Sequence, residues 1–403
     1  MLAVTGIGEL LTLAPDGDVL GVHHDATVVI TDGKVAFAGP AREAPALPSD
    51  ALRIDARGAL CTPGLVEPHA HPIFAGSRAG EFDLRARGAT YGEIQAAGGG
   101  ILATVRATSA ATDEELVAST LARLDRLLDH GVTVCEAKTG YSLDVDGELR
   151  LLRLLGEVKR RHAIDLSPTL LAHVPPPDCS SGEERRGFVE RFRAEAIPAA
   201  ARAGAEAFDV YCDAGAFTLD ETRALLGAAR ASGLALRVHA EQFTNTGAAD
   251  LAAAMGARSV EHLEQIAPPA IAALARAGTV CNLLPGAALT LRLPWPDARR
   301  LVDAGCAVAL GTDLNPGSSL TESLPLMMSL ACMQMGLGCA EAWRAVTVQA
   351  ARSVGRGDAG RLVAGARGDL VLWDAGDHRE VAQHFGVNLA RTVVVGGQVV
   401  RGG

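Results

Sequence analysis

His69 and His71 are the first residues of this chain whose types and spacing suit metal chemistry. They close the run Pro63-Gly64-Leu65-Val66-Glu67-Pro68-His69-Ala70-His71. Alternate residues of an extended strand point to the same side, so both imidazoles can reach one ion. The pair alone is weak evidence, because two such histidines also occur as solvated or capping side chains.

Two later residues, His239 and Asp313, strengthen this interpretation, since each follows an apolar run of its own. Together the four side chains offer three nitrogen ligands and one carboxylate oxygen. This set suits Zn²⁺ or Fe²⁺ and leaves room for a water molecule. The sequence therefore predicts a metal site that can turn a water into a hydroxide able to attack a carbonyl-like carbon.

Three more side chains could take part in such a reaction. His262 could stabilise the developing oxyanion, although a purely structural hydrogen bond would also explain it. Asp313 could both touch the metal and carry a proton to a leaving nitrogen. Lys138 has two interpretations: a carboxylated lysine that bridges two metals with His173 as a ligand, or a hydrogen-bonding lysine beside one metal.

The elements that position these residues follow a repeating pattern in which a helical stretch ends at glycine and an apolar, β-branched run comes next. The glycines and their runs are Gly131 before 132–137, Gly204 before 207–212, Gly233 before 234–238, Gly256 before 258–260, Gly278 before 279–284 and Gly305 before 306–310. Glycine after a helix supplies the left-handed conformation that turns the chain into a strand. With the runs 61–66 and 166–172, eight strands are expected.

Eight apolar strands alternating with amphipathic helices, such as 114–129, favour a closed (β/α)8 barrel over an open doubly wound sheet. In such barrels chemistry sits at the carboxyl ends of the strands. The residues at these ends are His69 and His71, Lys138, His173, Asp213, His239, His262 and Asp313. A histidine-rich cavity at the barrel mouth is the prediction.

The two ends of the chain have β-type patterns instead. Runs 26–31 and 34–38 flank the turn signal Asp32-Gly33, and runs 369–373 and 392–400 lie near the other end. We expect them to pair into one small β-sandwich domain made from both termini. The expected division is 1–61 and 359–403 for this domain and 62–358 for the barrel.

Composition excludes several classes of protein. Apolar residues make up 48% and charged residues 21%, which rules out a wholly disordered chain. The net charge of -10 argues against nucleic acid and anionic membranes as partners. Eight cysteines occur without a Cys-x-x-Cys pair, and neither a membrane span nor a secretory signal is recognisable. We expect reduced thiols and a cytoplasmic location.

Several longer motifs extend the pattern beyond the metal set. They are Gly76-Ser77-Arg78 with Glu81-Phe82, Gly88-Ala89-Thr90-Tyr91 with Ala97-Gly98-Gly99-Gly100-Ile101, Lys138-Thr139-Gly140-Tyr141, Gly311-Thr312-Asp313-Leu314-Asn315-Pro316-Gly317-Ser318-Ser319, and His384-Phe385-Gly386-Val387-Asn388. With the histidines, they make the chain resemble the amidohydrolase superfamily, metal-dependent hydrolases on a distorted barrel. Within it, the chain is similar to the imidazolonepropionase family over nearly its whole length.

This resemblance implies one divalent metal, Zn²⁺ or Fe²⁺, held by His69, His71, His239 and Asp313. It implies that His173 contacts the substrate, which counts against a carboxylated Lys138. The implied reaction is hydrolysis of 4-imidazolone-5-propanoate to N-formimidoyl-L-glutamate in a homodimer, with Asp313, His262 and His173 as catalytic residues. The implied substrate-binding residues are Arg78, Tyr91, Tyr141, His173, Gln242, Asn315, Gly317 and Ser318.

Each of these positions has a physical task. Arg78 offers a planar fork for the propanoate carboxylate, although most arginines lie on surfaces. Tyr91 and Tyr141 can cover a flat ring, although core packing would explain Tyr91 equally well. Gly317 would let backbone approach the ligand while Asn315 and Ser318 present hydrogen bonds, unless the segment is a plain turn.

Position 242 departs from some members of the family, in which a glutamate could act as a base. Gln242 cannot ionise, so the proton transfers must fall to Asp313 and His262, with Gln242 orienting the ring. Two rival functions remain: another cyclic amide hydrolase or aminopurine deaminase on the same barrel, and a non-catalytic oligomeric scaffold. Arg78 and Tyr141 argue against the first, and the complete metal set argues against the second.

Overall fold

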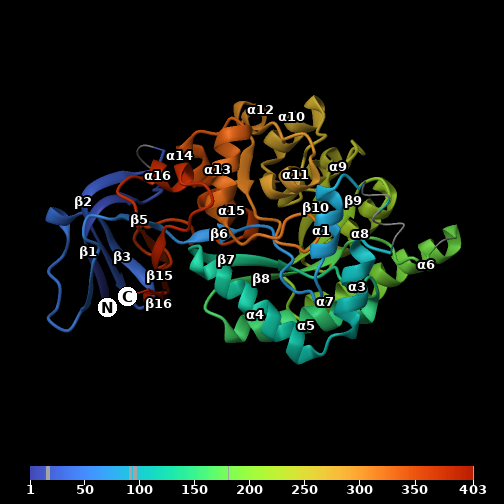
Figure 1. The fold of residues 1–403 in the computed structure, drawn as a ribbon, viewed down its shortest axis with the longest axis horizontal. Helices are drawn as coiled ribbons and strands as arrows, with labels where there is room; N and C mark the ends of the chain where they lie inside the picture. Colours follow the sequence, from blue (N-terminus) through green and yellow to red (C-terminus); the bar gives the residue numbers. More distant parts are fainter. Residues whose placement is uncertain (15–18, 90–92, 94–97, 180, 403) are drawn as a thin grey trace.

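The computed structural model describes residues 1–14, 19–89, 93, 98–179 and 181–402. Figure 1 shows a barrel with surrounding helices and, beside it, a smaller β domain in which the blue N-terminal and red C-terminal segments lie together. Among the described residues, no helix is both long and apolar enough to span a bilayer.

The barrel sheet has eight parallel strands in the chain order β6 to β13. The strands are β6 (Leu65–Glu67), β7 (Val132–Lys138), β8 (Asp165–Ala172), β9 (Ala207–Cys212), β10 (Ala235–Ala240), β11 (Ser259–His262), β12 (Val280–Leu283) and β13 (Ala307–Leu310). Their residues are almost all buried, because helices cover the outside and side chains fill the inside. The predicted fold class is confirmed.

The first and last strands meet just beyond their carboxyl ends. A parallel bridge joins Ala70 to Leu314. The Asp313 amide donates to the His69 carbonyl at 3.0 Å, and the His71 amide donates to the Leu314 carbonyl at 2.9 Å. This junction between the two ends of the sheet, hereafter the seam, places His69, His71 and Asp313 side by side.

The predicted strand 61–66 is wrong as a single element, because the chain divides it at Gly64. β5 (Leu60–Pro63) pairs with the small domain, whereas β6 pairs with β7. A side chain at Gly64 would place its Cβ 2.2 Å from Thr133 Oγ1, so only glycine lets the chain pass from one sheet to the other so close to β7.

Helices follow the strands and pack around them. They are α1 (Ala79–Ala86), α3 (Ile101–Ala110), α4 (Asp113–Asp129), α5 (Val145–Arg161), α6 (Gly182–Arg191), η2 (Phe192–Ala196), α7 (Ile197–Arg202), α8 (Leu219–Ala231), α9 (Ala248–Ala254), α10 (Pro268–Ala277), α11 (Pro285–Leu291), α12 (Ala298–Asp303), α13 (Leu324–Gln334), α14 (Cys339–Ala345), α15 (Val348–Val354) and α16 (His378–Gln383). The helix predicted at 114–129 is confirmed as α4, which Thr112 begins with a capping box. All six predicted turn glycines have positive φ.

The small domain is confirmed as a β structure built from both termini, hydrogen-bonded into one mixed sheet. Besides β5, its strands are β1 (Leu2–Leu11), β2 (Val22–Thr31), β3 (Lys34–Pro40), β4 (Leu52–Asp55), β14 (Leu370–Trp373), β15 (Ala390–Val395) and β16 (Gln398–Arg401), with η1 (Ala41–Glu43) after β3. β5 crosses the predicted boundary between 61 and 62, and the three domain ranges stay predictions.

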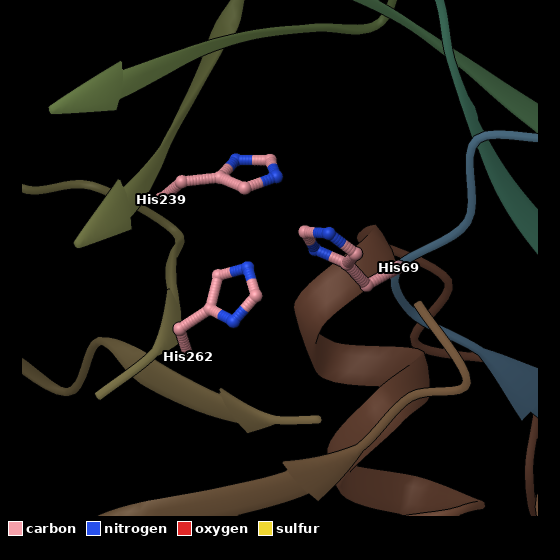
Figure 2. Close-up of side chains that lie close together, drawn as sticks. All are labelled: His69, His239 and His262. Carbon is pink, nitrogen blue, oxygen red and sulfur yellow. The ribbon is translucent and has the colours of Figure 1, made fainter. Parts of the chain in front are cut away.

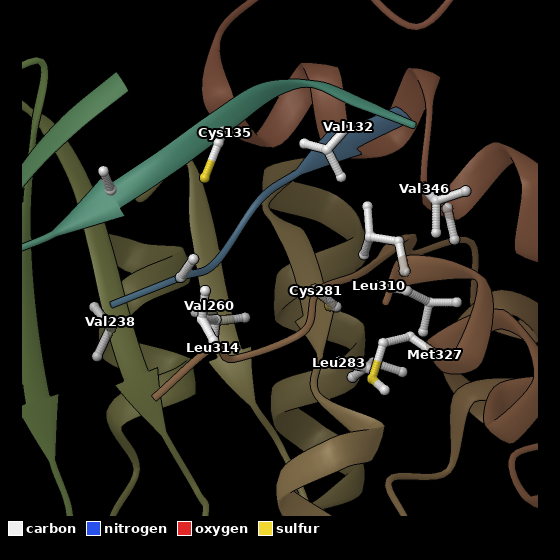
Figure 3. Packing of buried hydrophobic residues seen from close by; sticks show 14 of the residues in the cluster. Val132, Cys135, Val238, Val260, Cys281, Leu283, Leu310, Leu314, Met327 and Val346 are labelled. Atoms are coloured by element: carbon white, nitrogen blue, oxygen red, sulfur yellow. The ribbon is translucent and has the colours of Figure 1, made fainter. Parts of the chain in front are cut away.

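Apolar packing holds the barrel to its helices. Figure 3 shows part of this core, where Cys135, Val238, Val260 and Leu310 from the strands share a cluster with Met327 from α13. A second cluster lies inside the sheet, where Val354 of α15 packs with strand residues such as Val66 and Val134. The two clusters hold the strand ends rigidly, as a site built on them requires.

Candidate metal centre and substrate cavity

A cavity of about 120 Å³ opens at the carboxyl ends of the barrel strands. Its lining includes His71, Arg78, Tyr141, His173, Tyr211, His239, Gln242, His262, Asp313, Asn315, Gly317 and Ser318. His69 lies beneath it, fully buried. The structure thus brings together nearly all of the site residues predicted from the sequence.

His69, His71 and Asp313 form one tight group at the seam. The Nε2 atoms of His69 and His71 lie 3.3 Å apart. Asp313 Oδ1 lies 3.4 Å from His69 Nε2 and 3.5 Å from His71 Nε2. Ligand atoms from both sides of the seam therefore converge on one point.

His239 and His262 approach the same point from β10 and β11. Figure 2 shows the rings of His69, His239 and His262 pointing toward one another. Their ligand atoms all lie within 4.8 Å of one another. Two groups of possible ligands therefore share His69, one with His71 and Asp313 and one with His239 and His262, and the four-residue metal set stays a prediction.

Carboxylates behind the histidines orient two of the rings. Glu261 Oε2 lies 3.0 Å from His69 Nδ1, and Asp209 Oδ2 lies 3.1 Å from His239 Nδ1. A carboxylate at Nδ1 holds a proton on that nitrogen and leaves Nε2 as a lone-pair donor, which is the usual arrangement behind a metal-binding histidine.

The protonation states of these rings suit a metal. Burial lowers the pKa of His239 to about 4 and holds the pKa of His69 well below its usual range. The lone pairs of two facing ring nitrogens 3.3 Å apart repel each other unless a cation or a proton lies between them. The cluster therefore fits a divalent metal, which binds neutral imidazole and ionised carboxylate.

Asp313 supplies the anionic ligand. Burial alone would raise the pKa of Asp313, but His69 and His71 hold this pKa well below the usual range. Its Oδ1 faces the histidines, whereas the Ser318 hydroxyl donates to Oδ2 at 3.3 Å. The two oxygens thus face different neighbours.

His262 differs from the other rings because a carboxylate in its own loop accompanies it. Glu264 Oε1 lies 3.5 Å from His262 Nδ1. Burial alone would lower the pKa of His262, but the carboxylates of Glu264 and Asp313 raise this pKa. This ring therefore keeps both N–H groups to a higher pH than its neighbours do.

Lys138 is fully buried below the cavity between two carboxylates. Its Nζ lies 2.7 Å from Glu136 Oε1 and 2.5 Å from Asp209 Oδ2. Burial alone would lower the pKa of Lys138, but these two carboxylates raise this pKa. An ammonium held in two ion pairs does not present the free amine that carboxylation needs.

Lys138, Glu136, Asp209, Arg237 and Glu261 belong to a network of buried charged residues inside the barrel, below the histidines. Sequence analysis missed its carboxylates. Spacing along the strands was the available signal for buried charged residues of this kind. Glu67 precedes His69 by two positions, and Arg237 precedes His239 by two. Each charged residue therefore shares the inward face of an apolar strand with a strand-end histidine.

Arg78 lies beside the cavity just before α1, with its side chain 9% exposed. Its Nε and Nη2 donate to Glu81 Oε2 at 2.9 and 2.7 Å. A Cβ at Gly317 would lie 2.1 Å from Nη1, so the guanidinium packs directly on this glycine. Nη1 makes no hydrogen bond with a described residue, and Arg78 is among the residues that line the cavity.

Tyr141 and His173 form an aromatic wall of the cavity, with ring centroids 5.6 Å apart. His173 Nδ1 lies 3.0 Å from the Gly140 carbonyl, an acceptor only, so Nδ1 carries the proton. Burial lowers the pKa of His173 to about 3, which leaves Nε2 as an acceptor. Tyr91 lies outside the described residues.

Asn315 shapes the loop after β13. Its Oδ1 accepts from the amides of Gly317 and Ser318 at 2.8 Å, and its Nδ2 donates to the Asp313 carbonyl at 2.7 Å. These bonds use the polar atoms of Asn315 within the loop, so its contribution is to hold Gly317 and Ser318 at the cavity.

Gln242 and Asp213 lie across the cavity. Asp213 accepts from the backbone amides of Gln242, Phe243 and Thr244 and organises this loop. The third tyrosine, Tyr211, also lines the cavity, 5.7 Å from His239 between ring centroids, and the sequence analysis did not single it out. Tyr211 lies two residues after Asp209 on β9, so both side chains point to the same face of the strand, and this spacing could have identified Tyr211 from the sequence.

Comparison with known proteins agrees with this geometry. The amidohydrolase family model matches residues 95–401. Imidazolonepropionases from Rubrobacter xylanophilus, Myxococcus xanthus and Geobacillus kaustophilus are 46%, 44% and 43% identical to this chain. The alignments cover 94%, 99% and 94% of this chain and 91%, 96% and 91% of theirs.

Solved structures show the same fold at low sequence identity. A 5-methylcytosine deaminase from Klebsiella pneumoniae liganded with 5-fluorocytosine has a TM-score of 0.77 at 19% identity, with 100% of this chain and 98% of that chain covered. An adenosine deaminase from Xanthomonas campestris with bound zinc has a TM-score of 0.72 at 17% identity, with 100% and 93% covered. From the sequence matches together with the assembled cluster, the chain belongs to the imidazolonepropionase family of the amidohydrolases and is a hydrolase of that type.

Proposed function

We propose that this protein hydrolyses the cyclic amide C–N bond of 4-imidazolone-5-propanoate and releases N-formimidoyl-L-glutamate, a step of histidine degradation. The observation that carries the proposal is that one cavity is lined both by the guanidinium of Arg78 and by the cluster of His71, His239 and Asp313. A cation for a carboxylate and a hydrolytic centre thus face the same small space.

Substrate binding follows from the lining. The propanoate carboxylate lies at Arg78, because a desolvated anion needs a charged partner, and the Nη1 group donates to it while Nε and Nη2 hold Glu81. The flat ring lies against Tyr141, and His173 Nε2 accepts a hydrogen bond from a ring N–H. Gln242 presents an amide that orients the ring without taking up a proton.

We propose one divalent metal per chain, Zn²⁺ or Fe²⁺, held by His69, His71, His239 and Asp313. When bound, such an ion supplies Lewis-acid chemistry that activates water and a carbonyl oxygen at neutral pH. Support comes from the converging nitrogens at the seam and from the carboxylates that orient His69 and His239.

The proton transfers fall to residues with suitable positions. Asp313 takes the proton from the attacking water and delivers it to the ring nitrogen as the C–N bond breaks. Ser318 holds the other carboxylate oxygen and so keeps Asp313 in place. His262 donates a hydrogen bond to the oxyanion of the tetrahedral intermediate.

We further propose a homodimer and a cytoplasmic location. Phe385 and Val387 support the homodimer, because both are exposed apolar side chains on the family-like segment 384–388. The eight cysteines are all free thiols, which supports a reducing compartment. Size-exclusion chromatography with light scattering tests the dimer.

Loss of the ultraviolet absorbance of the imidazolone on mixing with purified protein tests the reaction, and mass spectrometry identifies the product. Arg78→Lys keeps the charge but removes the fork, so kcat/KM should fall about 10- to 150-fold, the worth of one charge-assisted hydrogen bond of about 1.5–3 kcal/mol. Arg87→Lys is the control, since Arg87 pairs with Asp83 on the surface. Absence of turnover by metal-loaded protein would reject the proposal.

A further inference from the structure

A second cavity, of about 410 Å³, lies at the opposite end of the barrel from the metal cluster. Residues of α14, α15 and the loop after α15 line it, among them Arg344, Arg352 and Arg361. Arg352 Nη2 donates to the carbonyl of Gly278, which precedes β12. The cavity therefore lies at the amino ends of the strands, separate from the catalytic mouth.

The guanidinium of Arg361 has no partner among the residues that the structure describes. It makes neither a hydrogen bond nor an ion pair with any described residue, although its Nε atom is buried. A buried N–H without an acceptor costs about 1–3 kcal/mol, more when the group is charged. Such a group indicates that an acceptor is supplied from outside the chain.

Arg258 adds a fourth guanidinium at the rim. A Cβ at Gly355, which lines the cavity, would lie 2.8 Å from Arg258 Nη1, so this arginine packs against the cavity wall. Within the described part of the chain its guanidinium has neither a hydrogen bond nor an ion pair. Burial and repulsion from Arg237 lower the pKa of Arg258, although Glu206 opposes this shift.

The remaining two arginines each have one backbone acceptor and no carboxylate. Arg352 donates to Gly278, and Arg344 donates to the Val19 carbonyl at 3.1 Å. A carbonyl accepts one or two N–H groups and leaves the charge uncompensated. Three guanidiniums therefore line a space whose described lining contains no acidic residue, and the guanidinium of Arg258 packs against its wall at Gly355.

A cavity whose described lining contains arginines but no carboxylate is unusual for a chain with 47 acidic and 37 basic residues. Nearby arginines do find carboxylates: Arg356 pairs with Asp165 and Glu206. Asp358, close to the cavity in sequence, pairs instead with Lys34. Among the described residues, no carboxylate forms an ion pair with any of the four guanidiniums.

We propose that this cavity binds a compact polyanion carrying two or more phosphate or carboxylate groups, held by Arg258, Arg344, Arg352 and Arg361. Guanidinium matches both groups in geometry and charge. Several anionic groups are needed to compensate four cations, and the volume admits more than a single phosphate. No described lining residue is aromatic, so the cavity offers no stacking surface for a nucleobase.

Isothermal titration calorimetry on the metal-loaded protein tests this, with fructose 1,6-bisphosphate as the phosphate probe and tricarballylate as the carboxylate probe. Both are weak metal chelators, and sodium chloride holds the ionic strength constant. We expect saturable binding of at least one probe, one molecule per chain, and the tighter probe identifies the chemical group. Metal content is measured before and after titration.

The variant Arg258→Gln/Arg361→Gln should lower the affinity at least tenfold, because it removes the two unpaired guanidiniums. Arg42→Gln/Arg53→Gln makes the same change in net charge at exposed positions and should leave the affinity unchanged. Arg78→Gln should also leave it unchanged, which separates this cavity from the catalytic one. Absence of saturable binding of either probe, equal binding by the double variant, or loss of binding in Arg78→Gln would overturn the proposal.

Discussion

The guanidinium of Arg78 occupies the space that a side chain at position 317 would fill. A Cβ at Gly317 would lie 2.1 Å from Nη1 and 2.9 Å from Cζ of Arg78. The loop after β13 and the segment before α1 therefore pack together at a position without a side chain, and the direction of the Arg78 guanidinium depends on it.

Gly317→Ala should displace Arg78 and reduce kcat/KM about 10- to 100-fold, since small misplacements of a positioning group are costly. Alanine adopts the backbone conformation at 317 freely, because its φ is not positive. Steady-state kinetics with the imidazolone should show most of the change in KM. Gly227→Ala, where an added Cβ meets nothing within 4 Å, is the control. An unchanged KM would show that Arg78 does not bind the carboxylate.

Elemental analysis of purified protein should find about one divalent metal per chain, because the described ligand atoms converge on one point at the seam. Chelation should abolish turnover, and Zn²⁺ or Fe²⁺ should restore it. His239→Ala should lose most of the metal while keeping the fold. Two equivalents would indicate instead a carboxylated Lys138 with His173 as a ligand.

Asp209→Asn should weaken metal binding about 10- to 100-fold, because the amide no longer holds a proton on His239 Nδ1. Titration with a chelating indicator measures the affinity, and excess metal should restore activity if the loss lies in His239. Asp213→Asn is the matched control, since this strand-end carboxylate accepts mainly from backbone amides. Equal metal affinities in the two variants would contradict the role of Asp209.

Asp313→Asn removes an anionic ligand and the proposed proton carrier together, so turnover should fall by several orders of magnitude. Gln242→Glu should give little gain, because the proposed relay does not use position 242. Single-turnover rates measure both. Near-normal turnover in Asp313→Asn would reject the scheme, and a large gain in Gln242→Glu would place the base at 242.

Glu206 should contribute stability that depends on pH. Burial alone would raise the pKa of Glu206, but hydrogen bonds from Arg356 and Lys159 lower this pKa to about 2. A lowered carboxyl pKa stabilises the folded state above the unfolded pKa, near 4.5, and the contribution declines as pH falls from about 5 toward 2. Urea unfolding should show Glu206→Gln less stable than the parent at pH 7, with the difference narrowing by pH 3.5.

Glu157→Gln is the control for this measurement, because Glu157 pairs with Arg161 on an exposed helix face. Such pairs contribute about 0–1 kcal/mol. A difference between Glu206→Gln and the parent that stays constant with pH would show that the carboxylate charge is not the stabilising feature.

The barrel strands and their polar ends were predictable because apolar runs, and the glycines that end the preceding helices, are local features of the sequence. Five of the strand-end residues, among them His173 and Asp313, line one cavity for that reason. The division at Gly64 was not predictable in the same way, because it depends on the distance to Thr133, a contact between segments far apart in sequence.

The carboxylates behind the histidines were missed for a similar reason. Glu261 and Asp209 lie inside apolar strands, where a single charged residue gives no indication of its partner. Only the closed barrel shows that Glu261 reaches His69, 192 positions away. Asn315 illustrates the reverse case: its motif suggested ligand contact, whereas its hydrogen bonds hold its own loop.

The seam also bears on how the barrel forms. Thr312 donates to Glu67 across 245 residues of sequence, so joining the first and last barrel strands closes a long loop. Loop closure of this length is entropically costly and slow. The proposed metal ligands stand on both sides of that junction, His69 and His71 on one and Asp313 on the other. An ion bound there would tie the two sides of the junction together, so the ligands proposed for the chemistry would also stabilise the closed barrel.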